Sequence, residues 1–145
     1  MENYKFVEIL LIEDNPGDAR LTQEALKAGK IKNNLHIMCD GEEATDFLFK
    51  KNKYINAPRP DLIILDLNLP RKNGQEVLAE IKNDENLKSI PVIILTISKS
   101  EEEIIKSYNL HANCFLTKPI DLNKFFEVVK SIEDFWLTLV KLPKL

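Results

Sequence analysis

The chain has 145 residues, of which 44% are hydrophobic and 30% charged, and its formal net charge is -3. These values fit one soluble domain with a single core, and the charge argues weakly against nucleic acid as the main partner. No apolar run approaches the roughly 18 residues that a membrane helix needs, and residues 1–5 lack a signal-peptide pattern, so we expect a cytoplasmic protein. Cys39 and Cys114 lack metal-type spacing and lie in apolar stretches, which predicts buried free thiols.

Strand-like and helix-like segments alternate along the chain. Short runs rich in Ile, Leu and Val predict strands over residues 6–12, 35–39, 62–65, 90–95 and 114–116. A helix is predicted after each strand, over about residues 15–29, 40–50, 73–83 and 98–108 and from 121 onward. Five strand–helix repeats without a linker predict one α/β domain over residues 1–145, with a parallel sheet covered on both faces.

Several of these helices have clear start signals. Asn15, Asp40 and Asn73 are each predicted N-caps, and an acidic residue stands three positions after each of them. Pro16 follows Asn15 at the first helical position, where its missing N–H costs nothing. The first helix is therefore expected to begin directly beyond the end of the first strand.

Polar side chains gather where the predicted strands end. Glu13 and Asp14 follow the first strand, Asp66 ends the third, Thr96 ends the fourth, and Lys118 follows the fifth. The carboxyl ends of parallel strands meet at one edge of a sheet, which is where such sheets bind ligands. These five residues are therefore expected to converge, although they span about a hundred positions.

The chemistry of this group favours a cation and a phosphoryl group. Three neighbouring carboxylates repel one another unless a cation lies among them. Because the expected ligands are all oxygens, Mg²⁺ or Mn²⁺ is favoured over zinc, and Mg²⁺ commonly partners phosphoryl groups. The Lys118 ammonium and the Thr96 hydroxyl could bind further oxygens, and one acid could act as a nucleophile to form an acyl phosphate.

At this point the motifs match a known family. Residues 12–15 (Ile-Glu-Asp-Asn), residues 66–70 (Asp-Leu-Asn-Leu-Pro), Thr96 and the Lys118-Pro119 pair occur in the order and at the strand ends seen there. The chain resembles the response-regulator receiver domains of two-component signalling over essentially its whole length. The resemblance implies a flavodoxin-like, doubly wound, five-stranded parallel sheet in the order 2-1-3-4-5, with five helices.

The same resemblance implies a role for each acid. Asp66 would be the phosphoacceptor, which attacks a phosphohistidine of a sensor kinase or a small phosphodonor. Asp14 would hold Mg²⁺ directly and Glu13 through water, with Asp66 and the backbone carbonyl of Asn68 as further ligands. Glu13 departs from the more common Asp at its position, but metal binding should survive the change.

Further roles follow for residues around the phosphoryl group. Lys118 would pair with the phosphoryl oxygens, and Thr96 would supply the switch hydroxyl. Phe115 matches the switch aromatic, with simple core packing as the alternative. The Lys118-Pro119 peptide is typically cis in this family, which makes Pro119 a cis-proline candidate. Ile97 is bulkier than the small residue often found after the threonine, and it could narrow access to the phosphoryl group.

The last predicted helix carries more apolar residues than one buried stripe needs. The surplus predicts a partner surface, with a cap over the protein's own core as the alternative. This tail and residues 18–21 resemble single-domain response regulators that partner cyanobacterial phytochromes and form homodimers through this end. The resemblance implies a sensor histidine kinase, phytochrome-like in type, and a downstream protein target, without an output domain and without nucleic acid or membrane contacts.

Three alternatives are open, two from other classes of protein and the third within the receiver-domain interpretation. A haloacid dehalogenase-type phosphatase also uses an Asp nucleophile, but it needs a second Asp where this chain has Asn68. A flavodoxin-type FMN binder needs a hydroxyl- and glycine-rich loop after the first strand, where Glu13 and Asp14 would repel the phosphate. A phosphorylation-independent adaptor would not need the complete set of acids with Lys118.

Overall fold

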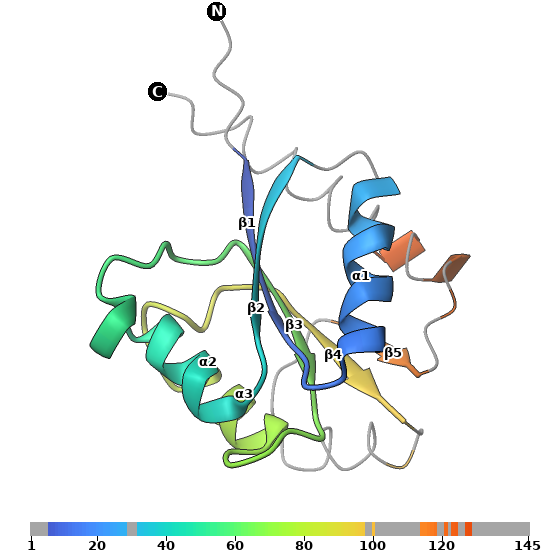
Figure 1. The fold of residues 1–145 in the computed structure, drawn as a ribbon. Helices are drawn as coiled ribbons and strands as arrows, with labels where there is room; N and C mark the ends of the chain where they lie inside the picture. The colour runs from blue at the N-terminus through green and yellow to red at the C-terminus, as the bar shows by residue number, and fades with distance from the viewer. Residues whose placement is uncertain are drawn as a thin grey trace, which may run out of the picture.

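The computed structural model describes residues 6–28, 32–97, 100, 114–118, 121, 123–124 and 127–128. These residues form a parallel five-stranded sheet in the order β2-β1-β3-β4-β5, as predicted (Figure 1). The strands are β1 (Val7–Ile12), β2 (Asn33–Met38), β3 (Leu62–Asp66), β4 (Val92–Thr96) and β5 (Cys114–Thr117). The strand order and direction place the carboxyl ends of β1, β3, β4 and β5 at one edge.

Helices cover both faces of the sheet, with α1 (Pro16–Ala28) on one side and α2 (Gly41–Leu48) and α3 (Gly74–Lys82) on the other (Figure 1). A short 3-10 helix, η1 (Asn52–Tyr54), follows α2. The three predicted N-caps are confirmed. The side chains of Asn15, Asp40 and Asn73 accept hydrogen bonds from backbone N–H groups three residues on, at 3.0, 2.7 and 2.9 Å respectively.

All of the fourth predicted helix except Ser100, which is helical, and most of the fifth lie outside the described residues. Asp121 does show the expected helix start, because its Oδ1 accepts hydrogen bonds from the N–H groups of Asn123 (2.9 Å) and Lys124 (3.3 Å). The predicted cis-proline, Pro119, and most of the predicted partner surface on the last helix also lie outside the described residues. Val128, which was predicted to belong to that surface, is partly buried and packs against the core layer on the α1 side.

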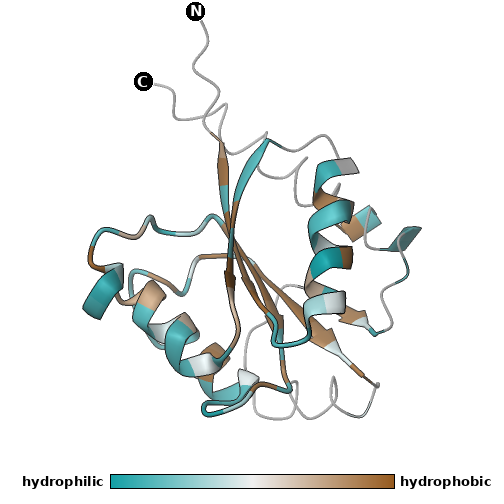
Figure 2. Cartoon of the chain, in the orientation of Figure 1, coloured by the Kyte–Doolittle hydropathy of each residue, from teal (hydrophilic) through white to brown (hydrophobic). Residues whose placement is uncertain are grey.

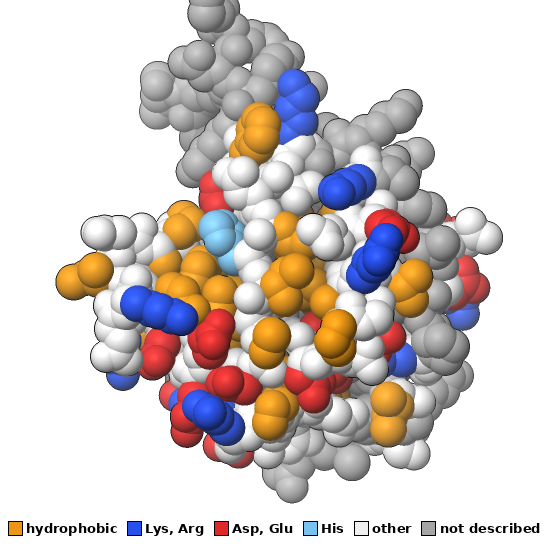
Figure 3. Space-filling model, in the orientation of Figure 1, with side chains coloured by type: hydrophobic (Ala, Val, Ile, Leu, Met, Phe, Trp, Pro, Cys, Tyr) orange, Lys and Arg blue, Asp and Glu red, His pale blue; other side chains and the backbone are white. Residues whose placement is uncertain are grey.

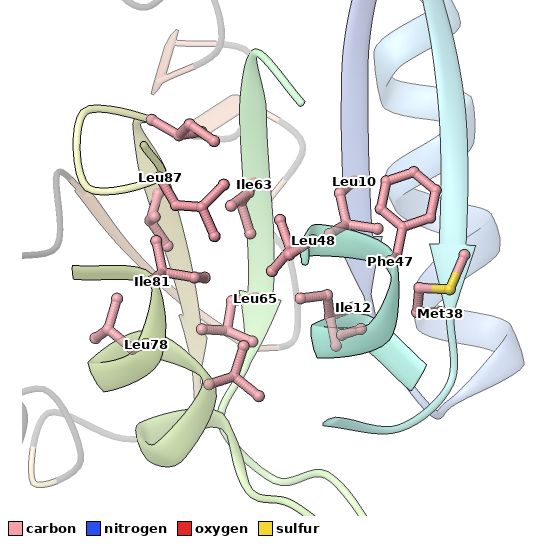
Figure 4. Packing of buried hydrophobic residues seen from close by; sticks show 14 of the residues in the cluster. Leu10, Ile12, Met38, Phe47, Leu48, Ile63, Leu65, Leu78, Ile81 and Leu87 are labelled. Atoms are coloured by element: carbon pink, nitrogen blue, oxygen red, sulfur yellow. The ribbon is translucent and has the colours of Figure 1, made fainter. Parts of the chain in front are cut away.

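Alternating strand residues divide the core into two layers. On β1, Leu10 and Ile12 face the α2–α3 side, whereas Ile9 and Leu11 face the α1 side. Figure 4 shows the first layer, where side chains of β1 and β3 pack against α2 and α3. Figure 2 shows the apolar strands enclosed between helices with polar outer faces. Burial of each Leu or Ile side chain contributes about 1.5–3 kcal/mol to the free energy of unfolding. The strands are therefore stably packed and hold the polar residues that follow them in place.

Two sequence expectations need correction. Cys39 was expected to be buried, but it is exposed as a free thiol, because it follows the end of the edge strand β2 and no strand covers it on that side. The second strand was expected to begin at Leu35 but begins at Asn33, which pairs with Val7 of β1. Among the described residues, no helix is long and apolar enough to cross a membrane.

Candidate phosphoryl and metal site

The strand register assembles the predicted site residues at one edge of the sheet. Ile12 of β1 pairs with Leu65 of β3, so the next residue on each strand, Glu13 and Asp66, also lie side by side. β3 aligns in turn with β4, which ends at Thr96. Thr96 pairs with Thr117 of β5, one residue before Lys118. Hydrogen-bonded pairing therefore brings together residues that are far apart in the sequence.

The Lys118 ammonium lies at the centre of this group. Its Nζ is 2.7 Å from Glu13 Oε1, 3.0 Å from Asp66 Oδ2 and 3.1 Å from Asp18 Oδ2. Glu13 thus forms a short ion pair with the lysine, while Asp66 Oδ2 also accepts a hydrogen bond from it. One backbone bond fixes the lysine, since its N–H donates to the carbonyl of Thr96 at 2.6 Å. The cation is thus held at the edge by both its backbone and its side chain.

Three carboxylates form a compact oxygen cluster beside the lysine. Glu13, Asp14 and Asp66 each offer one oxygen, and these oxygens all lie within 4.8 Å of one another. Glu13 and Asp66 are buried, whereas Asp14 is exposed and opens the cluster to solvent. Hard oxygen ligands with one open side fit a hydrated divalent cation such as Mg²⁺ or Mn²⁺.

The electrostatics of the cluster show an excess of negative charge. Burial, and then the neighbouring Asp66 carboxylate, raise the pKa of Glu13 from 4.5 to about 7, although Lys118 acts in the opposite direction. Burial alone would lower the pKa of Lys118, but its contacts with Glu13 and Asp66 outweigh this and raise it. One lysine does not balance the acids around it, so the cluster would gain from a further cation.

Thr96 lies fully buried at the end of β4. Its Oγ1 has no hydrogen-bond partner among the residues that the structure describes. A buried hydroxyl without a partner costs about 1–3 kcal/mol, so its retention suggests a use beyond packing. A hydroxyl in this state is available for an oxygen that arrives at the site.

The loop after Asp66 is shaped by close backbone packing. The N–H of Asn68 donates to Asp66 Oδ1 at 3.1 Å, which orients the carboxylate. A Cβ at Gly74 would lie 2.5 Å from both the Asp66 carbonyl oxygen and Leu67 Cα, so only glycine fits there without a shift. Because Gly74 is the first residue of α3, this close approach ties the start of the helix to the end of β3.

Phe115 and Ile97 lie at the margin of the site. Phe115 is half-buried and packs against the core layer on the α2–α3 side. Ile97 is 59% exposed, directly after Thr96. Packing of Phe115 is thus observed, while its role as a switch aromatic stays a prediction.

Sequence analysis missed one member of the group, Asp18. It treated Asp18 only as part of the first helical turn, yet the side chain contacts Lys118. Asp18 lies in the first turn of α1, which begins just beyond the end of β1 at the same edge of the sheet. Figure 3 shows acidic side chains gathered in the lower half of the view, the half that holds the carboxyl ends of β1 and β2.

This fold and its acidic edge define a receiver-type α/β signalling domain. Residues 9–130 match the family described as "Response regulator receiver domain", so the chain belongs to the response-regulator receiver domains. It is a response regulator of this kind, with the fold that the resemblance implied.

Particular relatives narrow the comparison. The chain is 53% identical over 135 residues to response regulator Rcp1 of Synechocystis sp., covering 93% of this chain and 92% of that protein. The phosphorylated cyanobacterial phytochrome response regulator RcpA is 50% identical with a TM-score of 0.79, covering 93% and 96% of the two chains. The Mn²⁺-bound form of Rcp1 is 53% identical with a TM-score of 0.77, covering 90% and 94%.

Proposed function

We propose that Asp66 of this response regulator accepts a phosphoryl group from a sensor histidine kinase. One observation supports this above the others. The Lys118 ammonium lies 3.0 Å from Asp66 Oδ2, beside a three-carboxylate cluster that fits a divalent cation. The arrangement places positive charge where the oxygens of a transferred phosphoryl group would need it.

The proposed transfer forms one bond and breaks one. An Asp66 oxygen attacks the phosphorus, the P–N bond of the kinase phosphohistidine breaks, and the imidazole leaves with the electron pair. Lys118 compensates the charge on the phosphoryl oxygens. Hydrolysis ends the modified state: water attacks phosphorus, the acyl-phosphate P–O bond breaks, inorganic phosphate leaves and the Asp66 carboxylate returns.

The cation we propose is Mg²⁺, held by Glu13, Asp14, Asp66 and the backbone carbonyl of Asn68. The acid-only donor set fits a hard cation, and burial next to Asp66 raises the pKa of Glu13. When bound, the cation would neutralise phosphoryl oxygens during transfer. Rcp1 is known in a Mn²⁺-bound form, which supports a divalent ion of this size and hardness.

The proposed output is a conformational switch. The Thr96 hydroxyl, buried without a partner among the described residues, would move to the phosphoryl group. Phe115, half-buried on β5 and paired with Ile94, two residues before Thr96, would follow. A cis Lys118-Pro119 peptide would aim the lysine. The partner surface on the last helix would then bind a downstream protein or a second copy of the chain.

The relatives suggest the kind of kinase. RcpA is a cyanobacterial phytochrome response regulator that has been obtained in a phosphorylated form. We extend this to a phytochrome-like histidine kinase for the present chain, with residues 1–145 acting as one receiver domain in the cytoplasm. Phosphotransfer from such a kinase, measured against a kinase of unrelated sensory type, would test the partner separately from the chemistry.

The chemistry is tested by incubation with acetyl phosphate and Mg²⁺, with intact mass and oligomeric state measured together. We expect the wild-type chain to gain one phosphoryl group and Asp66→Asn to gain none. Asp46→Asn removes the same charge from α2, away from the site, and should behave as wild type. Absence of any gain in the wild-type chain would contradict the proposal and favour a phosphorylation-independent adaptor.

A further inference from the structure

Asp18 is the third carboxylate on Lys118, and it comes from a different element than the other two. It lies in the first turn of α1, and its Oδ2 is 3.1 Å from the lysine Nζ. Its backbone is fixed on both sides, since its N–H donates to Asn15 Oδ1 (3.0 Å) and its carbonyl accepts from Thr22 Oγ1 (3.1 Å). The carboxylate therefore meets the lysine from a rigid support.

The simplest alternative role for Asp18 is in the helix cap. An acid at this position usually reaches back to the N–H of the cap residue. Here the N–H of Asn15 instead donates to Glu13 Oε2 at 3.4 Å, and the Asp18 carboxylate is engaged with Lys118. The cap is completed by Asn15, so Asp18 is not needed to receive that hydrogen bond.

The three carboxylates on Lys118 differ in exposure. The Glu13 and Asp66 side chains are 0% and 3% exposed, whereas that of Asp18 is 30% exposed. The Asp18 contact is also the longest of the three, at 3.1 Å. Because water screens it and can solvate it after release, Asp18 is the partner that Lys118 gives up at least cost.

Carboxylate oxygens of three residues lie within 3.1 Å of Lys118 Nζ, as many as an ammonium has N–H donors, and one of them, Asp66 Oδ2, accepts a hydrogen bond from it. A phosphoryl oxygen that binds Lys118 must therefore displace a carboxylate or share a donor with it. Asp18 also adds negative charge at the exposed side of the site, where an anionic phosphodonor would arrive. Both effects oppose phosphoryl binding.

We infer that Asp18 is a positioning residue that competes with the phosphoryl group for Lys118, holding the ammonium in the unmodified protein and releasing it when Asp66 is phosphorylated. This inference rests on the proposed function. By thermodynamic linkage, whatever weakens the Asp18–Lys118 contact strengthens phosphoryl binding to the same extent. Release would also leave the Asp18 carboxylate without its ion pair on the first turn of α1. Phosphorylation of Asp66 would then increase the negative charge exposed on that part of the surface.

The test is a titration with beryllofluoride in saturating Mg²⁺, followed by NMR. Asp18→Asn keeps the size and an acceptor oxygen but removes the charge, and Asp18→Ala removes both. We expect either change to lower the half-saturating concentration about two- to fivefold, as expected for a screened charge pair. In the wild-type chain, the Asp18 carboxyl resonance should move toward its solvent-exposed position as beryllofluoride binds.

Two matched variants separate the contact from general charge. Glu76→Gln removes the acid at the same position of α3, and Glu24→Gln removes an exposed acid elsewhere on α1. Both should bind beryllofluoride as the wild type does.

Equal or weaker binding by both Asp18 variants would overturn the inference, as would an equal gain in Glu24→Gln. Failure of the wild-type chain to bind would instead overturn the proposed function, and the inference with it.

Discussion

At the amino end of the sheet, the Glu8 carboxylate has a separate partner for each oxygen. His36 Nε2 lies 2.8 Å from Oε1, and Asn34 Nδ2 donates to Oε2 at 2.8 Å. Asp61 accepts the N–H of Glu8 at 2.9 Å. At the carboxyl end, by contrast, Glu13, Asp18 and Asp66 share the Lys118 ammonium.

The two ends of the sheet contain similar residue types, but they differ in how fully the charges and hydrogen-bonding groups are paired. The amino-end network gives each carboxylate its own hydrogen-bond partner, which stabilises the fold and leaves little to gain from a ligand. The carboxyl end combines unbalanced charge with the buried hydroxyl of Thr96, which lacks a partner among the described residues. A polar strand end is thus not enough to mark a functional site; unmet charge and hydrogen-bonding capacity mark it.

The largest effect should come from removing the shared cation. Lys118→Met leaves Glu13 and Asp66 buried without compensation, which should cost about 3 kcal/mol of unfolding free energy at pH 8 without metal. The cost should shrink toward pH 6, because protonated Glu13 no longer repels Asp66. Urea unfolding at both pH values measures this. A cost that does not depend on pH would show that the acids are not coupled through Lys118.

The next largest effect is the change in unfolding free energy with pH and with Mg²⁺. Burial and Asp66 raise the pKa of folded Glu13 to about 7, from 4.5. The stability from this group is therefore fully present below about pH 4.5 and is lost as pH rises through 7. Mg²⁺ at a hundredfold excess over its Kd should add about 2.7 kcal/mol, and its binding at pH 6 should release a proton.

Calorimetry at pH 6 in two buffers of different ionisation enthalpy measures that proton. Glu13→Gln is the matched variant, because it keeps the side-chain size but has no proton to release. Equal proton release in Glu13→Gln and in the wild type would assign the proton to another group.

A smaller change in stability is expected when either of two buried threonines is replaced by valine, and the two changes should have opposite signs. Thr96 Oγ1 has no partner among the described residues, whereas Thr22 Oγ1 donates to the carbonyl of Asp18 at 3.1 Å. Thr96→Val should therefore stabilise the protein by about 1 kcal/mol, while Thr22→Val should destabilise it by a similar amount. Thermal or urea unfolding compares them, and a loss of stability in Thr96→Val would show that its hydroxyl is already satisfied.

The sequence predicted the helix caps and the convergence of Glu13, Asp66 and Lys118, because these depend on local patterns and on the parallel direction of the strands. The strand order came instead from the family resemblance. It missed the Asp18–Lys118 contact, because the direction of a side chain from a first helical turn depends on how that helix packs. Cys39 was mispredicted for a related reason. Apolar neighbours indicate a strand, but they do not reveal that the strand ends at Met38, one residue before Cys39.

The smallest effect should appear at the amino end. Glu8→Gln keeps a hydrogen-bonding group of the same size beside His36 and Asn34, so it should cost less than about 1 kcal/mol. The change in unfolding free energy on adding Mg²⁺ should equal that of the wild type, because the amino-end network lies at the opposite end of the strands from the acidic cluster. Urea unfolding with and without Mg²⁺ gives both values. If Glu8→Gln altered the Mg²⁺ effect, the two ends of the sheet would be energetically coupled through β1, and the distinction between a self-contained structural network and a separate functional edge would fail.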